Sequence, residues 1–228
     1  MNKLILFFAL LFTGTNAISQ DCSRFYPLSE GTTMQITSYG ANEKVAGIID
    51  YSVDNVQTNA DVVTATMNTT IKDKKGALIA ETDYEVSCSD DVVSIDFKSM
   101  MSQHSLKQFE NLETEVTGTN LDLPNNLSVG QELPDASMNI KINMSGINME
   151  TAININNRKV IGKEDVTTPA GTFSCYVISY STDLSTMGMN QSSNAKQWIS
   201  EGVGMVKQED YNKKGRISSS SLLTAFSK

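Results

Sequence analysis

Residues 138–144 read Met-Asn-Ile-Lys-Ile-Asn-Met, and their strict alternation decides the fold class. Every even position is apolar and every odd one is polar, which is typical of a β-strand with one buried face and one wet face. After residues 145–148 (Ser-Gly-Ile-Asn) the alternation resumes on the opposite parity, with apolar side chains at Met149 and Ile153 among others. The stretch therefore predicts an antiparallel β-hairpin.

The same two-residue period recurs along most of the chain. Two similar turns, residues 73–76 (Asp-Lys-Lys-Gly) and 212–215 (Asn-Lys-Lys-Gly), each separate a pair of alternating segments. About ten strands joined by short links predict an all-β, mainly antiparallel fold, in which the sheet curls into a half-barrel, barrel or sandwich. No alternating strand–helix pattern is found, so a parallel dinucleotide-binding fold is not expected.

One segment favours a helix. Residues 102–112 begin with a serine suited to an N-cap and place Leu106, Phe109 and Leu112 three positions apart. We therefore expect one short helix beside the strands. The segment also holds His104, the single histidine of the chain, which we interpret as a solvated or cap-adjacent side chain because it lacks catalytic or zinc-binding companions.

The first residues have the features of a secretory signal peptide. A basic start precedes an unbroken apolar run, Leu4–Phe12, which is too short to span a bilayer, and small residues follow before Gln20. We predict a signal peptide at residues 1–19 and a single β-rich domain at residues 20–228. The protein is therefore expected to be exported, to the periplasm, the cell surface or the medium.

The charge of the chain limits its partners. The formal net charge is −8, which disfavours binding to nucleic acid, and the sequence shows no basic patch that would reverse this. No segment after the leader approaches the roughly 20 apolar residues that a membrane helix requires. We expect neither nucleic-acid binding nor a transmembrane segment once the signal peptide is removed.

Three cysteines enter an oxidising compartment, so we expect a disulfide between two of Cys22, Cys88 and Cys175. The alternation places Cys88 and Cys175 on buried faces, whereas Cys22 lies in an irregular stretch that can reach either of them. The sequence does not choose among the three pairings. Asp21, directly before Cys22, is neither small nor apolar, which argues against lipid attachment there.

No catalytic, metal-binding or cofactor-binding residue is predicted. The decapeptide TTPAGTFSCY at residues 167–176 resembles a catalytic loop, but its Pro-Ala-Gly is ordinary turn chemistry and Cys175 has no nearby histidine. Ser193 and Lys196 match S-x-x-K without its usual partner motifs. Adjacent carboxylates such as Glu209 and Asp210 point to opposite faces of a strand and do not converge.

Met138, Met144 and Met149 lie on one face of the predicted hairpin, and Met187 and Met189 lie in a loop. The simplest interpretation is core filling by flexible side chains; the alternatives are a pliable wall for a lipid-like ligand and a soft site for Cu(I). The residues predicted to face an apolar ligand are Met138, Ile140, Ile142, Met144, Met149 and Ile153.

Four segments together resemble a known family. They are FYPLSEG (25–31), LPNNLSVGQELPDA (123–136), NRKVIGKEDVTTPAGTF (157–173) and QWISEGVGMVKQEDY (197–211). The chain resembles the TapB-like family of exported Gram-negative bacterial proteins over nearly the whole mature length and, more loosely, a family of unknown function. The resemblance implies a β-rich periplasmic or surface domain without an established reaction, and it carries over no catalytic residue.

The function predicted from the sequence is non-enzymatic binding of an apolar or lipid-like small molecule, or of an envelope component. A curled antiparallel sheet provides a concave apolar face suited to such a ligand. Two alternatives stay open at this point: a carboxylate-based hydrolase acting on envelope glycan or ester, and a methionine-rich Cu(I)-binding protein.

Overall fold

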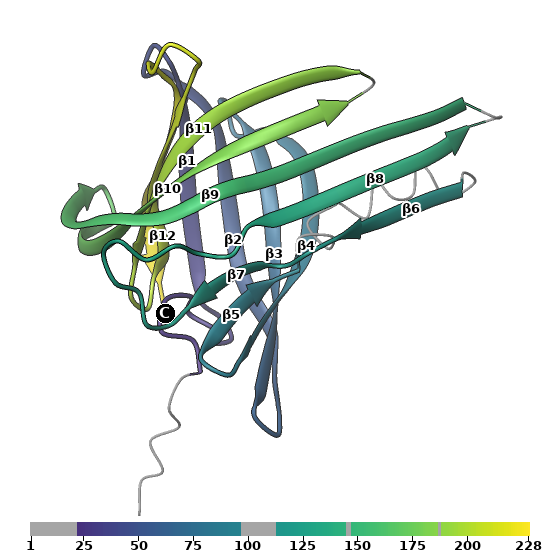
Figure 1. The fold of residues 1–228 in the computed structure, drawn as a ribbon. Coiled ribbons are helices and arrows are strands. Elements are labelled where there is room, and N and C mark those ends of the chain that lie inside the picture. Colours follow the sequence, from purple (N-terminus) through teal and green to yellow (C-terminus); the bar gives the residue numbers. More distant parts are fainter. Residues whose placement is uncertain (1–21, 97–112, 145–146, 187) are drawn as a thin grey trace, which may run out of the picture.

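A computed structural model describes residues 22–96, 113–144, 147–186 and 188–228, which form one sheet of thirteen β-strands (Figure 1). In chain order the strands are β1 (Thr33–Gly40), β2 (Val45–Asn59), β3 (Val62–Asp73), β4 (Leu78–Ser89), β5 (Val92–Ile95), β6 (Glu113–Gly118), β7 (Leu121–Pro124), β8 (Ala136–Met144), β9 (Ile147–Thr168), β10 (Gly171–Thr186), β11 (Met189–Ser200), β12 (Gly204–Tyr211) and β13 (Ile217–Ser227).

All neighbouring strands are antiparallel, in the order β6-β8-β9-β10-β11-β12-β13-β1-β2-β3-β4-β5-β7. The two edge strands, β6 and β7, are consecutive in the chain and are separated only by Thr119 and Asn120. Strand β6 bonds to β8 at one edge, whereas β7 bonds to β5 at the other. A short bent segment therefore joins both edges, which forces the sheet to curve around a shared interior.

The predicted fold class needs correction. It included one short helix, but the described residues contain strands, turns and loops and no helix, and the predicted helical segment 102–112 lies outside the described residues. The strands also form one open sheet, not a closed barrel or a two-layer sandwich. The physical reason is that hairpins, together with the β13–β1, β6–β8 and β5–β7 pairings, join every described strand into one sheet, so no strands remain for a second sheet.

The interior face of the sheet follows from the strand register. Tyr51 of β2 lies opposite Met34 of β1 and Thr69 of β3, and Thr69 lies opposite Thr82 of β4. One step further along the strands, Val53 and Met67 lie opposite each other, and both are buried. Because side chains alternate along a strand, these rows share one face, on which the main hydrophobic core is built.

The chain before β1 closes one end of this interior. Cys22 is bonded to Cys88 of β4, and Phe25 is fully buried with its ring edge-on to Tyr176, the two centroids lying 5.9 Å apart. Asn125 fixes the same segment, because its side chain accepts from the backbone N–H of Arg24 at 2.8 Å and donates to the carbonyl of Cys22 at 2.5 Å. We call residues 22–28 the plug.

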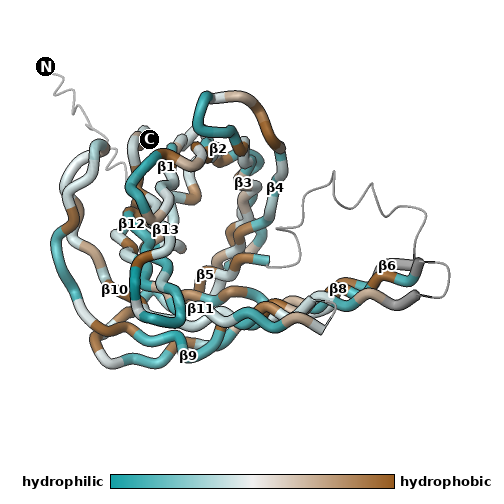
Figure 2. Tube along the Cα trace, turned by 90° about the horizontal axis from the view of Figure 1, so that it is seen from above, coloured by the Kyte–Doolittle hydropathy of each residue, from teal (hydrophilic) through white to brown (hydrophobic). Residues whose placement is uncertain are grey.

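Strands β6, β8 and β9 extend away from the body of the sheet as an arm (Figure 2). Strands β8 and β9 form the expected hairpin, with Met138 opposite Ile153 and Ile142 opposite Met149, although β9 already begins at Ile147. Asn157 has a φ of 56° at a register shift between β9 and β10. This bulge changes the parity of the inward-facing residues along β9, from odd numbers in the arm to even numbers in the body.

Candidate functional site

At the end opposite the plug, the inward side chains of the curved sheet are only half-buried. We call this part of the inner face the cup. Its walls are formed by Ser38, Ile49, Tyr51, Ile71, Ala80, Thr82, Tyr84, Tyr180, Gln208, Asp210 and Ser221.

The wall formed by β2, β3 and β4 is mainly apolar. Ile49 lies opposite Ile71, and Ile71 lies opposite Ala80, so an aliphatic row lies nearest the open end. The next row inward carries Tyr51, and the floor beyond it is the buried core around Val53. The inward side chains therefore become more buried from the open end of the cup towards the plug.

Four tyrosines contribute hydroxyl groups to this space. Burial and then neighbouring Tyr26 raise the pKa of Tyr51 to about 12. Burial also raises the pKa of Tyr84 well above its usual value, with contributions from Tyr51 and Tyr26. The pKa of Tyr180 is raised by burial and then by Asp210 and Tyr26. Tyr26 of the plug thus influences the other three tyrosines, all of which lie in surroundings of low polarity.

Several hydroxyls on this inner face have no hydrogen-bond partner among the described residues. The Oγ1 atoms of Thr69 and Thr82 are buried and unpaired, although the two residues lie directly opposite each other on β3 and β4. A buried hydroxyl without a partner costs about 1–3 kcal/mol. The inner face therefore carries buried hydroxyls whose hydrogen-bonding capacity the described residues leave unused.

The wall formed by β12, β13 and β1 is polar. Asp210 accepts hydrogen bonds from the hydroxyl of Ser219 at 2.8 Å and from the Gln208 amide at 3.1 Å. The hydroxyls of Ser38 and Ser221 lie 3.0 Å apart. One wall of the cup is thus aliphatic and aromatic, while the facing wall is hydrogen-bonding.

Arg158 lies beside the cup and bonds to the backbone of the 122–134 segment. The bulge at Asn157 turns the Arg158 side chain inward, where Nη1 donates to the carbonyls of Pro134 at 2.5 Å and Asp122 at 2.8 Å. Burial lowers the pKa of Arg158, and nearby Tyr26 and Asp122 oppose that change. The guanidinium ties the 122–134 segment to β9 and places a positive charge near the tyrosines.

The residues predicted to face a ligand lie in the arm. Met138, Ile140 and Ile153 form a small cluster with Val116 and Leu121. Met149 and Ile142 lie opposite each other nearer the end of the arm, and the side chain of Met144 lies outside the described residues. Leu121 also packs against the main core, so this apolar face is continuous with the interior of the sheet.

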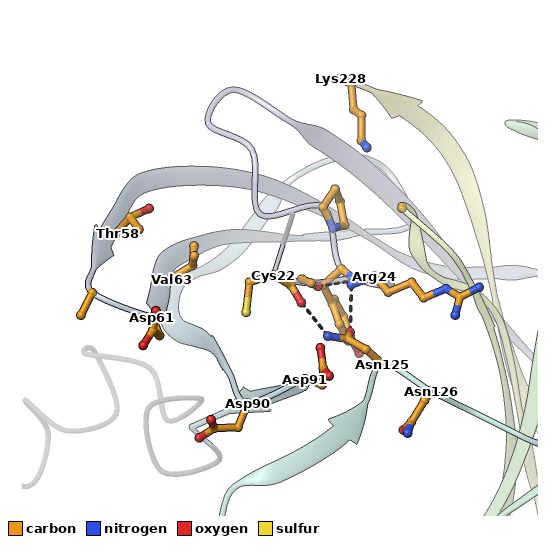
Figure 3. A pocket seen from close by; sticks show the side chains of 15 residues that line it. Cys22, Arg24, Thr58, Asp61, Val63, Asp90, Asp91, Asn125, Asn126 and Lys228 are labelled. Atoms are coloured by element: carbon orange, nitrogen blue, oxygen red, sulfur yellow. Dashed lines mark hydrogen bonds between the residues drawn. The ribbon is translucent and has the colours of Figure 1, made fainter. Parts of the chain in front are cut away.

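An open pocket of about 980 Å³ lies at the plug end of the molecule (Figure 3). Its lining mixes polar and apolar side chains and includes Asp61, Asp90 and Asp91 from two turns, together with Asn125. Among the described residues no group of three or more acidic, histidine or cysteine side chains is arranged to hold a metal ion. Of the methionines in the Cu(I) hypothesis, Met187 and the side chain of Met144 lie outside the described residues.

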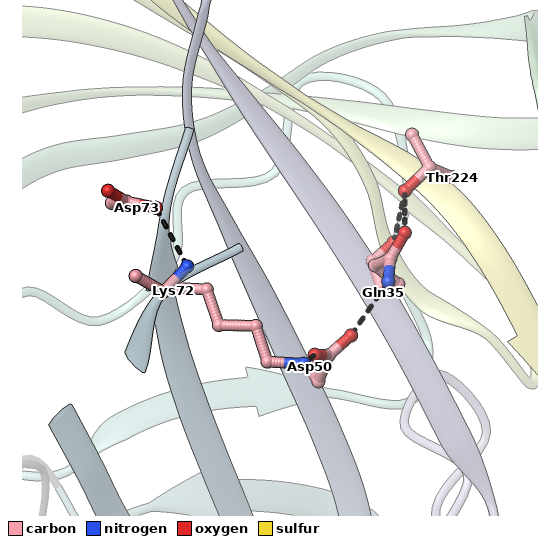
Figure 4. A network of polar contacts seen from close by, with 6 residues as sticks. Gln35, Asp50, Lys72, Asp73 and Thr224 are labelled. Carbon is pink, nitrogen blue, oxygen red and sulfur yellow. Dashed lines mark hydrogen bonds and ion pairs between the residues drawn. The ribbon is translucent and has the colours of Figure 1, made fainter. Parts of the chain in front are cut away.

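A second polar cluster lies on the outer face of β1, β2 and β3 (Figure 4). Asp50 accepts from Gln35 at 2.9 Å and from the ammonium of Lys72 at 2.7 Å, while the Thr224 hydroxyl lies 3.1 Å from the Gln35 amide oxygen. Burial opposes ionisation of Asp50, but the bonds from Lys72 and Gln35 outweigh it and lower its pKa. With every group paired, the cluster is structural.

The adjacent carboxylates of β9 and β12 do not converge. Glu164 accepts from the Trp198 indole at 2.5 Å, and Glu209 pairs with Lys207 at 2.7 Å on the face opposite Asp210. His104 lies outside the described residues. Cys175 is a free, fully buried thiol whose Sγ lies 3.4 Å from the carbonyl oxygen of Phe173.

Cys175 should resist alkylation in the native protein. Burial, followed by the charges of Asp165 and Glu164, raises its pKa to about 11, so little thiolate forms near neutral pH. We expect less than about a tenth of the protein to react with iodoacetamide at pH 8 within an hour, and complete reaction after denaturation. Mass spectrometry of both samples, with Cys175→Ala as the control, measures this; rapid labelling of the folded chain would contradict a structural role.

Comparisons with known proteins agree with this architecture. Residues 29–223 match the DUF3108-like family. The chain belongs to the DUF3108-like family. The family match does not confirm the finer resemblance to the TapB-like family. None of the curated proteins compared with the chain matches it.

Two solved structures share the fold of this DUF3108-like protein. One, from Bacteroides fragilis NCTC 9343, is described as an exported protein with a YmcC-like fold; it is 24% identical, with a TM-score of 0.73. The other, from Parabacteroides distasonis ATCC 8503, is described as a lipoprotein; it is 23% identical, with a TM-score of 0.74. Each comparison covers 91% of this chain and 100% of the other.

Sequence reasoning did not identify the cup. It selected the arm because methionine and isoleucine alternate there, whereas the cup is assembled from seven strands that span residues 33–227. One signal was present: Tyr51 and Tyr84 each fall on the inward parity of an otherwise apolar strand. Within the described residues, no helix is long and apolar enough to cross a bilayer.

Proposed function

We propose that this DUF3108-like protein is an exported, non-enzymatic binding protein that holds a small amphiphilic molecule in the cup. The ligand class is a molecule with an acyl-like chain and a hydrogen-bonding group. The observation that carries the proposal is the pairing of an aliphatic wall with unsatisfied hydroxyls, Thr69 and Thr82, on one inner face.

The two walls fit different parts of such a ligand. The row of Ile49, Ile71 and Ala80 suits a hydrocarbon chain, because burying apolar surface is favourable by about 25 cal/mol per Å². Asp210 and Gln208 on the facing wall suit a polar head group. The apolar face of the arm, which is continuous with the interior through Leu121, would extend the surface available to a longer chain.

Export is supported by three independent features. The leader has the composition of a signal peptide, the Cys22–Cys88 disulfide requires an oxidising compartment, and the two solved relatives are described as an exported protein and a lipoprotein. The resemblance to the TapB-like family supports the same location. The boundary of the leader at residue 19 and the single domain at residues 20–228 stay predictions.

Filling the cup should weaken ligand binding. We expect Ala80→Trp to weaken binding of the fluorescent fatty acid cis-parinaric acid at least about tenfold, because the indole would project from the inner face beside Ile71. Glu81→Trp is the matched control, since Glu81 is exposed and, as the next residue along β4, points away from the cup. Its affinity should stay within about twofold of the unmodified protein.

Two outcomes distinguish an error in the ligand site from an error in the binding function. Equal binding by both tryptophan variants would place the ligand elsewhere. An unmodified protein that binds no probe, and that carries no lipid by mass spectrometry when purified without detergent, would reject the binding function itself.

A further inference from the structure

Three turns lie together at the open end of the cup. They connect β1 to β2, β3 to β4, and β12 to β13 (Figure 1). Their neighbourhood follows from the register, because Gly40 pairs with Ser219 of β13 and Gly47 pairs with Asp73 of β3. We call residues 40–46, 73–79 and 211–217 the tip surface.

The tip surface is basic although the chain is acidic. Its 21 residues hold six of the 18 lysines and arginines and only two carboxylates, for a local charge of +4 in a chain of −8. The six cations are Lys44, Lys74, Lys75, Lys213, Lys214 and Arg216.

These cations are available to a partner. All six are exposed, and none forms an ion pair with another described residue. The carboxylate of Asp73 is engaged by its own turn, where it accepts from the backbone N–H groups of Lys75 and Ala77 at 2.8 Å each. Asn212 closes the β12–β13 turn in the same way, which holds Lys213 and Lys214 outward.

Exposed apolar side chains lie among the cations. Leu78 is 60% exposed, Ile79 65%, Ile217 46% and Val45 37%, which makes four of the eight large exposed apolar residues in the described chain. Neighbouring basic and apolar side chains on projecting turns are what an anionic membrane interface binds, because the cations contact the head groups and the apolar tips enter the boundary layer.

We propose that the tip surface docks the protein on an anionic phospholipid bilayer, with the mouth of the cup towards the lipid. A membrane fits better than an acidic protein because the apolar residues project from separate turns and do not line a groove. The inference does not depend on what the cup binds, since its residues lie outside the cup.

Vesicle binding tests the docking surface. In low salt, the protein should co-sediment with phosphatidylcholine vesicles containing 30% phosphatidylglycerol and not with phosphatidylcholine alone. Replacing Lys74, Lys75, Lys213 and Lys214 by Glu should lower the partition constant at least about tenfold. Leu78→Ser with Ile79→Ser should lower it about threefold or more without changing the charge.

The matched control reverses four cations away from the tip surface, Arg24, Lys141, Lys159 and Lys228, which gives the same net charge. It should lose far less binding than the tip variant. Equal losses would mean that net charge alone attracts the protein, and would overturn the proposal. An unmodified protein that stays in the supernatant would also overturn it. Probe binding by the folded tip variant would show that the cup functions separately.

Discussion

Replacement of Cys22 by Ala should lower the free energy of unfolding by about 4 kcal/mol. The unfolded chain regains the conformational entropy that the disulfide removes by closing a loop of this length. The bond joins residues 66 positions apart and anchors the plug to β4. Cys22 is the better position to change, because Cys88 is fully buried and its remaining thiol would pack as a small apolar group.

Guanidinium denaturation of the oxidised protein, the reduced protein and the Cys22→Ala variant measures this effect. The reduced protein and the variant should show the same loss. Cys175→Ala is the control, since that thiol lies outside the disulfide and its replacement should cost only about 1 kcal/mol. A difference below about 1 kcal/mol between oxidised and reduced protein would show that the plug is held mainly by other contacts, such as those of Asn125.

The alternation of β8 and the first part of β9 was sufficient to predict their pairing and which side chains share a face, because a one-residue slip would expose every apolar side chain. It did not predict the length of the turn, since β9 begins at Ile147, or that β9 continues as one strand of 22 residues. The bulge at Asn157 changes the parity of the buried positions there, and a period of two cannot reveal such a change.

The predicted helix shows a different limit. Its apolar spacing at residues 106, 109 and 112 is compatible with a helix, but three positions give a weak signal, and the segment lies outside the described residues. The alternation also did not predict the four-residue strand β5, or that the chain divides into β6 and β7 at residues 119–120, because β5 and β7 pair at one edge of the sheet and β6 lies at the other. Such pairing depends on contacts between distant segments and not on local propensity.

The basic tip surface could not be predicted from the sequence, for a related reason. Each turn contributes only one to three cations, so no sequence window resembles a basic patch in a chain of net charge −8. The pairing of β13 with β1 and of β2 with β3 is what brings the turns together. The pairing of Cys22 with Cys88 was likewise open at the level of sequence, because it depends on where the plug meets β4.

Raising the pH above 10 should unfold the protein steeply, because four tyrosines lie on or beside the inner face of the cup. Burial raises the pKa of Tyr26, Tyr51, Tyr84 and Tyr180 in the folded state, to about 12 for Tyr51. Unfolded tyrosines release their protons near pH 10, so above this pH the folded state binds more protons than the unfolded state. Stability is then complete below pH 10 and is lost as the pH rises towards the folded pKa values.

Each such tyrosine lowers the free energy of unfolding by about 1.4 kcal/mol per pH unit in this window, so four together approach about 5 kcal/mol per unit. This is comparable to the whole stability of a typical domain, and we expect cooperative unfolding within about two pH units above 10. Tyrosinate absorbance at 295 nm and circular dichroism should therefore change together.

The double variant Tyr51→Phe with Tyr84→Phe should have about half the slope, while its stability at pH 8 changes little, because neither hydroxyl bonds a described residue. Titration of all seven tyrosines before any loss of sheet signal would mean that the cup is wetter than its walls indicate, and would weaken the case for an apolar ligand.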